Sequence, residues 1–88
     1  MDKLMVTLLD HCSGDVFDLE VPLEVEIEKL LDDIVQSLNG CDQKQRPPAC
    51  ELELYSRRQN RVLGRDKNLD QEQVWTGDYL ELNYHEYK

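Results

Sequence analysis

The sequence contains no long apolar run that could serve as a signal peptide or a membrane span. Its longest early run, residues 4–9, has six residues and includes Thr7. A secretory signal needs about 7–15 apolar residues behind a basic segment, and a transmembrane helix needs about 20. We therefore expect a cytoplasmic protein that does not insert directly into a membrane.

Positive charge and paired cysteines are also scarce. Ten Lys and Arg residues stand against 19 Asp and Glu residues, so the formal net charge is −9. Such a chain is a poor binder of nucleic acids and of anionic membranes, because both require a positive surface. Cys12, Cys41 and Cys50 are odd in number and widely spaced, which is typical of reduced thiols and not of a disulfide framework.

The sequence shows no catalytic or metal-binding pattern. Its histidines, His11 and His85, and its cysteines lie in separate segments, without C-x-x-C or H-x₃-H spacing. His11 and Cys12 are neighbours in an expected turn, where no third group orients them as a nucleophilic pair. A chain of 88 residues has little room for both a core and an enclosed cleft. We expect no cofactor, no metal and no enzymatic activity.

Apolar periodicity predicts several strands and one helix. Apolar and polar side chains alternate, as in strands, in residues 3–9, 16–21, 51–55 and 79–84, and a short apolar pair occupies 62–63. Apolar residues at positions 27, 30, 31, 34, 35 and 38 instead follow a helical period. We expect Asn39 and Gly40 to end this helix.

This order of elements predicts an α+β fold in which one helix packs across one face of a single sheet. The strand alternation and the helical period together define the expected core, and the alternation in the last strand also directs Tyr84 inward. The expected core residues are Leu4, Val6, Leu8, Phe17, Leu19, Val21, Ile27, Leu30, Leu31, Ile34, Leu52, Leu54, Leu69, Leu80 and Leu82.

The end of the chain resembles the closing segment of ubiquitin-like β-grasp domains. In it, Leu69 and Val74 precede a Gly-Asp turn and a final strand in residues 76–82 (TGDYLEL). Within that superfamily, residues 14–19 (GDVFDL) and the helix after them resemble the YukD/EsaB family. These are small ubiquitin-like proteins encoded with bacterial type VII (WXG100, Ess/Yuk) secretion systems. The resemblance covers nearly the whole chain.

The resemblance implies a single ubiquitin-like domain over residues 1–88, with a mixed sheet of four or five strands and one helix across it. It also implies a non-enzymatic cytoplasmic adaptor or regulator of type VII secretion, whose protein partner is a membrane component or an ATPase. A protein modifier would need a C-terminal Gly-Gly, and residues 83–88 (NYHEYK) contain no glycine, which disfavours that alternative. An orphan ubiquitin-like interaction domain is the other alternative.

Two surfaces are candidates for protein binding, and the first is a basic cluster. Residues 57–67 hold five basic side chains and one acidic side chain, a net charge of +4. Arginine makes bidentate contacts with carboxylates, so this cluster would suit an acidic partner. The alternative is a solvated loop that the domain's own acidic residues neutralise. The basic residues are Arg57, Arg58, Arg61, Arg65 and Lys67.

The second candidate is the sheet face turned away from the helix, where alternation places Glu53, Tyr79 and Glu81. Ubiquitin is recognised through an apolar patch on this face, so glutamates here disfavour ubiquitin-type readers. We expect Glu53 and Glu81 to repel one another, which a basic partner would relieve. A face that is simply solvated is the alternative.

Three aromatic residues each have two interpretations, one structural and one in binding. Trp75 is expected to pack at the edge of the core, with an exposed binding anchor as the alternative. Tyr84 and Tyr87 flank the tail and could extend a contact between copies of the chain, so a homo-oligomer is possible; a frayed tail is the alternative.

Overall fold

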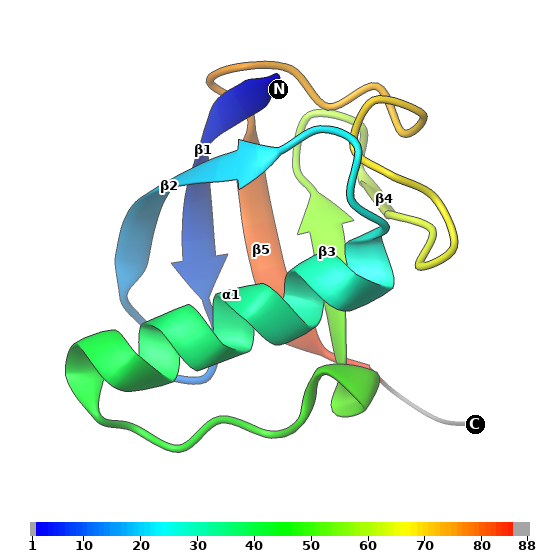
Figure 1. Cartoon of the computed structure of the whole chain (residues 1–88). Helices are drawn as coiled ribbons and strands as arrows, with labels where there is room; N and C mark the ends of the chain where they lie inside the picture. The colour runs from blue at the N-terminus through cyan, green and yellow to red at the C-terminus, as the bar shows by residue number, and fades with distance from the viewer. Residues whose placement is uncertain (1, 86–88) are drawn as a thin grey trace.

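A computed structural model describes residues 2–85, and in this part of the chain a sheet is covered on one face by one α-helix (Figure 1). The long strands and the helix expected from the periodicity are all present. In chain order the elements are β1 (Lys3–Asp10), β2 (Val16–Pro22), α1 (Ile27–Asp42), the 3-10 helix η1 (Ala49–Glu51), β3 (Leu52–Ser56), β4 (Arg61–Val62) and β5 (Tyr79–Tyr84).

The strands form one mixed five-stranded sheet in the order β2-β1-β5-β3-β4. The first and last strands, β1 and β5, run parallel, with Leu8 opposite Leu80, and the other neighbouring strands are antiparallel. Because side chains alternate along each strand, Leu8 of β1, Leu54 of β3 and Leu82 of β5 lie on the face that the helix covers. This mixed sheet with one helix across it confirms the expected β-grasp arrangement.

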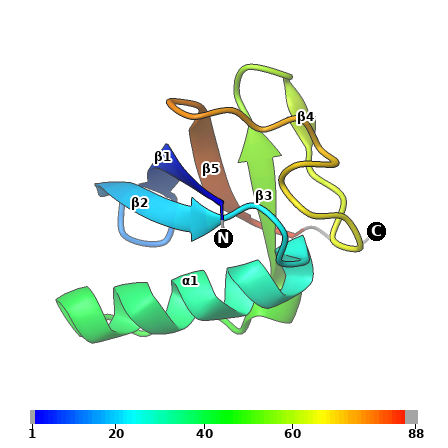
Figure 2. The same ribbon diagram turned by 45° about the horizontal axis from the view of Figure 1, so that its top comes forward.

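The helix and the sheet form two layers, which Figure 2 shows from a second direction. Six apolar side chains of α1 at helical spacing are buried against the sheet: Ile27, Leu30, Leu31, Ile34, Val35 and Leu38. Burying a side chain of this size contributes about 1.5–3 kcal/mol, so this stripe is a large share of what holds the helix in place. The helix begins against the loop at 65–67, because Ile27 and Glu28 donate their backbone N–H groups to Lys67 and Arg65 carbonyls.

The helix does not end where the sequence indicated. Gly40 lies inside α1, and the left-handed residue is Gln43, with φ of 59°. The Gln43 N–H donates to the Asn39 carbonyl, which closes the last turn. The side chains of Asn39 and Asp42 both accept hydrogen bonds from Arg46, and these contacts account for the additional turn.

The core differs from the expected set at its margins. Phe17 and Leu19 are only partly buried, because they lie on β2, the strand at the edge of the sheet. Tyr84 is 53% exposed, because it is the last residue of β5, which emerges below α1 (Figure 1). Further buried residues that we did not include in the expected core are Val35, Leu38, Ala49, Leu63 and Val74.

A buried ion pair fixes the long connection between α1 and β3. Asp10, at the end of β1, is fully buried, and its carboxylate lies 2.7 Å from Arg46 Nη2. The Arg46 side chain is only 1% exposed and also lies 2.6 Å from the Asp42 carboxylate. Burial tends to raise the pKa of Asp10, but hydrogen bonds from Ser13, Arg46 and the Cys12 N–H lower it below its ordinary value.

Candidate protein-binding surfaces

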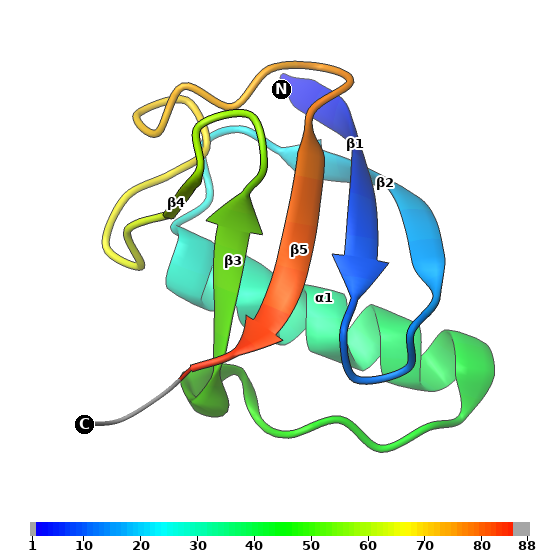
Figure 3. The same cartoon turned by 180° about the vertical axis from the view of Figure 1, so that it is seen from behind.

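The face of the sheet opposite α1, here called the outer sheet face, carries polar and aromatic side chains on β3 and β5, and the apolar Met5 and Val16 on β1 and β2. Figure 3 shows this face, with β3, β5 and β1 toward the viewer and α1 behind them. Tyr79 and Glu81 lie on β5, and Glu53 and Tyr55 lie on β3. All four are partly buried, so each exposes only part of its side chain.

Arg57 and His11 both contact the Glu81 carboxylate on the outer sheet face. Arg57 Nε lies 3.2 Å from Glu81 Oε2, and the guanidinium stacks 4.6 Å from the centroid of the Tyr79 ring. His11 Nε2 lies 2.5 Å from Glu81 Oε1. The Arg57 side chain remains 54% exposed, so it can still reach a partner.

The two glutamates singled out in the sequence do not face each other. The strand register places Glu53 opposite Asn83 and Glu81 opposite Tyr55, so the glutamates are diagonal neighbours. Glu53 Oε1 lies 3.1 Å from His85 Nδ1. Each glutamate has a nitrogen partner of its own, and the diagonal placement separates the two carboxylates more than direct opposition would, which reduces the repulsion that we expected between them.

Trp75 is not packed at the core edge, as the sequence led us to expect, but is 59% exposed. The guanidinium of Arg58 covers one face of its indole, 3.8 Å from the ring centroid. Arg58 Nε donates to Asp78 Oδ1 at 2.9 Å, and its Nη2 donates to the Gln73 carbonyl. The indole therefore packs against an arginine that the turn before β5 holds in place, and it does not need a place in the core.

The Asp78 carboxylate anchors this turn. Burial tends to raise the pKa of Asp78, but hydrogen bonds from Arg58 and from the Trp75 N–H lower it below its ordinary value. The Asp78 carbonyl in turn accepts from the Thr7 N–H at 3.0 Å, which connects the turn to β1. Arg58 is thus part of the support for the sheet as well as part of the surface.

Arg61 and Arg65 also have internal partners. Arg61 Nη1 lies 2.7 Å from Glu72 Oε2, which accepts a second hydrogen bond from the Gly64 N–H. Burial tends to raise the pKa of Glu72, but these two contacts lower it below its ordinary value. Arg65 donates to the Leu52 and Ala49 carbonyls at 2.5 and 3.0 Å. The basic cluster is therefore distributed over separate internal contacts, and Arg57 is its most accessible arginine on the outer sheet face.

Comparison with known protein families assigns the chain to one of them. The family model described as "WXG100 protein secretion system (Wss), protein YukD" matches residues 5–82. The chain belongs to the YukD family. The matched range extends from β1 to β5 and includes both candidate surfaces of this YukD-family chain.

Several solved structures that are similar to the YukD-family chain are ubiquitin-like domains. The EccD5 ubiquitin-like domain from Mycobacterium xenopi has a TM-score of 0.78 and 15% identity, with both chains fully covered. The ubiquitin-like domain of the Mycobacterium tuberculosis type VII secretion system protein ECCD1 has a TM-score of 0.69 and 24% identity, covering 94% of this chain and 99% of that one. The UBL domain of Plasmodium falciparum Dsk2 has a TM-score of 0.73 and 12% identity, covering 96% and 100%. At these identities the likeness shows the fold. No curated protein matches the chain.

Across residues 2–85, no cluster of three or more His, Cys, Asp or Glu side chains could hold a metal ion. Nor does a helix in this range have the length and apolarity to cross a bilayer. Sequence reasoning missed the exposure of Trp75 and the role of Arg46. The Asp42–Arg46 spacing, one helical turn, was the signal available for the latter.

Proposed function

We propose that this protein is a non-enzymatic cytoplasmic adaptor or regulator of a bacterial type VII secretion system. The observation that carries the proposal is the match of the YukD family model to residues 5–82. The ECCD1 and EccD5 ubiquitin-like domains, one of them named as part of a type VII secretion system, have the same fold and support the assignment. The expected partner is a protein, specifically a membrane component or an ATPase of the machinery.

The outer sheet face supplies the binding surface in this proposal. Arg57 and Tyr79 form a stacked pair on this face, where β3 ends and β5 begins, and Arg and Tyr are enriched among residues that dominate binding energy. Glu81 contacts Arg57, and Glu53 lies further along the same face. Both glutamates are already partnered, so they would fix orientation more than add affinity. Arg58, Arg61 and Arg65 border the surface and support the loops beside it.

A deletion strain tests the secretion role. Deleting the gene in the source bacterium should abolish or reduce secretion of WXG100 substrates under inducing conditions, and the wild-type protein should restore it. Unchanged secretion in the deletion strain would reject the secretion role and favour an orphan interaction domain. Intact-mass analysis of the endogenous protein tests the modifier alternative, because conjugation would add high-mass adducts.

Surface variants test the binding face. The Arg57→Ala, Tyr79→Ala double variant should weaken capture of the secretion component about tenfold or more, since it removes the stacked pair. Glu81 keeps His11 as a partner in this variant, so the fold should be retained. The matched control is Lys44→Ala, Tyr84→Ala, which removes one exposed cation and one exposed tyrosine elsewhere. Equal capture by the two variants would assign binding to another surface.

A further inference from the structure

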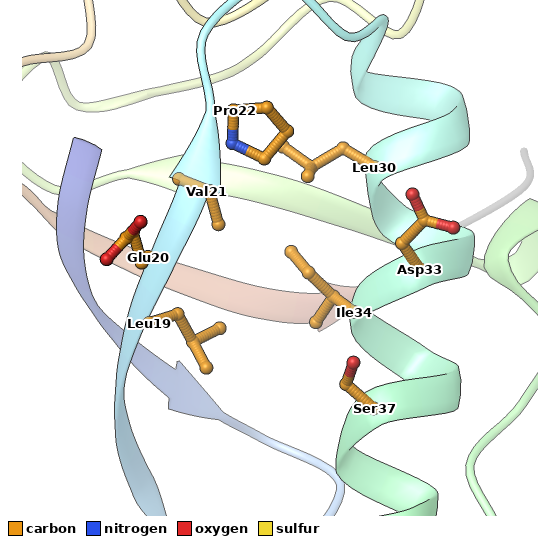
Figure 4. Close-up of a pocket in the computed structure, with 8 residues that line it drawn as sticks. All are labelled: Leu19, Glu20, Val21, Pro22, Leu30, Asp33, Ile34 and Ser37. Atoms are coloured by element: carbon orange, nitrogen blue, oxygen red, sulfur yellow. The ribbon is translucent and has the colours of Figure 1, made fainter. Parts of the chain in front are cut away.

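A groove lies between β2 and α1, on the opposite layer of the molecule from the outer sheet face. Leu19 and Val21 of β2 point toward Leu30 and Ile34 of α1 across it (Figure 4). The hollow has a volume of about 120 Å³. Drug-sized ligands occupy about 300–1,000 Å³, whereas about 150 Å³ of apolar space can hold a benzene ring. The groove thus has room for an aliphatic side chain of a protein partner but not for a typical cofactor.

The strand that borders this groove has an open backbone edge. Within the described residues β2 pairs with β1 alone, at the end of the sheet order. The Asp10 N–H donates to the Asp15 carbonyl at one end of the β1–β2 hairpin, and the Leu23 N–H donates to the Asp2 carbonyl at the other end. Between these two points, every second residue of β2 forms its backbone hydrogen bonds with β1. By this alternation the backbone groups of Val16, Asp18 and Glu20 are directed at the free edge. An added strand could pair there, and its side chains would alternate between the groove and the outer sheet face.

The side chains around this edge are predominantly acidic. Asp18 and Glu20 lie on the outer side of β2, opposite Thr7 and Met5, and both are exposed. Asp33 lines the groove from α1 and is also exposed. Lys3 lies 3.6 Å from Glu20, but both side chains are more than half exposed, so this pair offsets little of the negative potential. The edge therefore favours a basic strand.

The same charges disfavour a second copy of this chain as the occupant. Two β2 strands that paired edge to edge would bring the Asp18 and Glu20 side chains of both copies onto one face. Like charges on neighbouring strands are destabilising, and charged edge strands commonly prevent self-association for this reason. A partner of opposite charge meets no such obstacle. The opposite edge of the sheet, β4, has only two residues and offers a much shorter template.

We propose that the free edge of β2 binds an extended basic segment of another protein, which adds to the sheet as a further strand and inserts an aliphatic side chain into the groove between β2 and α1. The recognised segment alternates aliphatic residues, which face Leu19, Val21 and Ile34, with Lys or Arg residues, which face Asp18 and Glu20. This inference rests on the groove, the edge and the charges, and does not depend on the secretion role.

A synthetic peptide tests the proposal directly. Its length matches β2, which has seven residues, and it alternates isoleucine or valine with lysine or arginine. Titration into the ¹⁵N-labelled protein should shift the amide signals of β2 and α1, with a dissociation constant below about 1 mM. Hydrogen exchange at the Val16, Asp18 and Glu20 amides should slow in the complex, because a paired strand protects them. A peptide N-methylated on the pairing edge should lose this protection and bind at least about tenfold more weakly.

Charge-reversed variants test the recognition. Asp18→Lys, Glu20→Lys should weaken peptide binding about tenfold or more at low salt, and Asp33→Lys should weaken it to a smaller extent. Glu51→Lys makes the same charge change as Asp33→Lys, at an exposed site beside β3, and should leave affinity unchanged. Shifts confined to the outer faces of β3 and β5, or equal affinity for a peptide with glutamate in place of its basic residues, would overturn the proposal. Protection of the same amides in concentrated protein without peptide would also overturn it, in favour of self-association.

Discussion

At the scale of single residues, the Arg46 guanidinium balances the negative charges of two carboxylates, those of Asp10 and Asp42. It does so although its side chain is almost entirely buried. Its remaining N–H capacity is used by the Asn39 side chain. No buried side-chain nitrogen or oxygen in residues 2–85 lacks a hydrogen-bond partner. A buried charge network of this kind tolerates the loss of a member poorly, because the remaining charges stay desolvated.

The Arg46→Met variant should therefore lose about 3–5 kcal/mol of unfolding free energy, measured by urea denaturation. Methionine conserves much of the apolar volume, so the loss reports on the uncompensated Asp10 carboxylate. Adding Asp10→Asn should restore part of the stability, since the buried charge is then gone. Lys44→Met, which removes only an exposed 3.8 Å pair with Asp15, should change stability by less than about 0.5 kcal/mol. A similarly small effect of Arg46→Met would contradict this account.

At the scale of elements, periodicity predicted the four long strands and the helix because each buries one face, and burial leaves a period of 2 or 3.6 in the sequence. The end of α1 is not marked by a periodic pattern in the sequence. Gly40 is typical of a helix end, yet the contacts that extend the helix come from Arg46, in a segment that reads as a loop. For the two candidate surfaces, the sequence predicted which residues they contain but not how those residues contact one another. Strand alternation placed Tyr79 and Glu81 on the outer sheet face, but the Arg58–Trp75 stack depends on residues from separate loops.

The position of Gly40 inside α1 leads to a prediction about helix stability. A Cβ built on Gly40 would meet nothing within 4 Å. Gly40→Ala should therefore raise the free energy of unfolding by about 0.5–1 kcal/mol, because alanine restricts the unfolded chain and favours helix. Thermal and urea denaturation followed by circular dichroism would measure the change.

Gly77→Ala is the matched control for this substitution. Gly77 also has open space around its Cβ position, but its φ is +88°, so alanine there is strained and should destabilise the protein. A loss of stability in Gly40→Ala as well would mean that residue 40 adopts a helix-terminating conformation, as the sequence pattern alone indicated.

At the scale of the whole molecule, protonation of two sets of carboxyl groups changes the stability of the fold in opposite directions. The net charge is −9 at pH 7 and vanishes near pH 4.5, so mild acidification relieves repulsion among exposed carboxylates. Asp10, Glu72 and Asp78 behave differently, because their pKa values in the folded protein are lowered by internal hydrogen bonds and arginines despite burial. These three groups bind fewer protons in the folded state than in the unfolded state.

The free energy of unfolding should therefore stay constant or rise slightly from pH 7 to about pH 5. Below about pH 4 it should fall, because Asp10, Glu72 and Asp78 become protonated more readily in the unfolded chain than in the folded protein. High salt separates the two effects. At 1 M the Debye length is about 3 Å, so the initial rise should disappear, whereas the fall below about pH 4 should persist because its ion pairs are in contact. Glu72→Gln should make the fall shallower, since glutamine does not titrate. If Glu72→Gln leaves the fall in the free energy of unfolding unchanged, the acid sensitivity belongs to the other carboxyl groups.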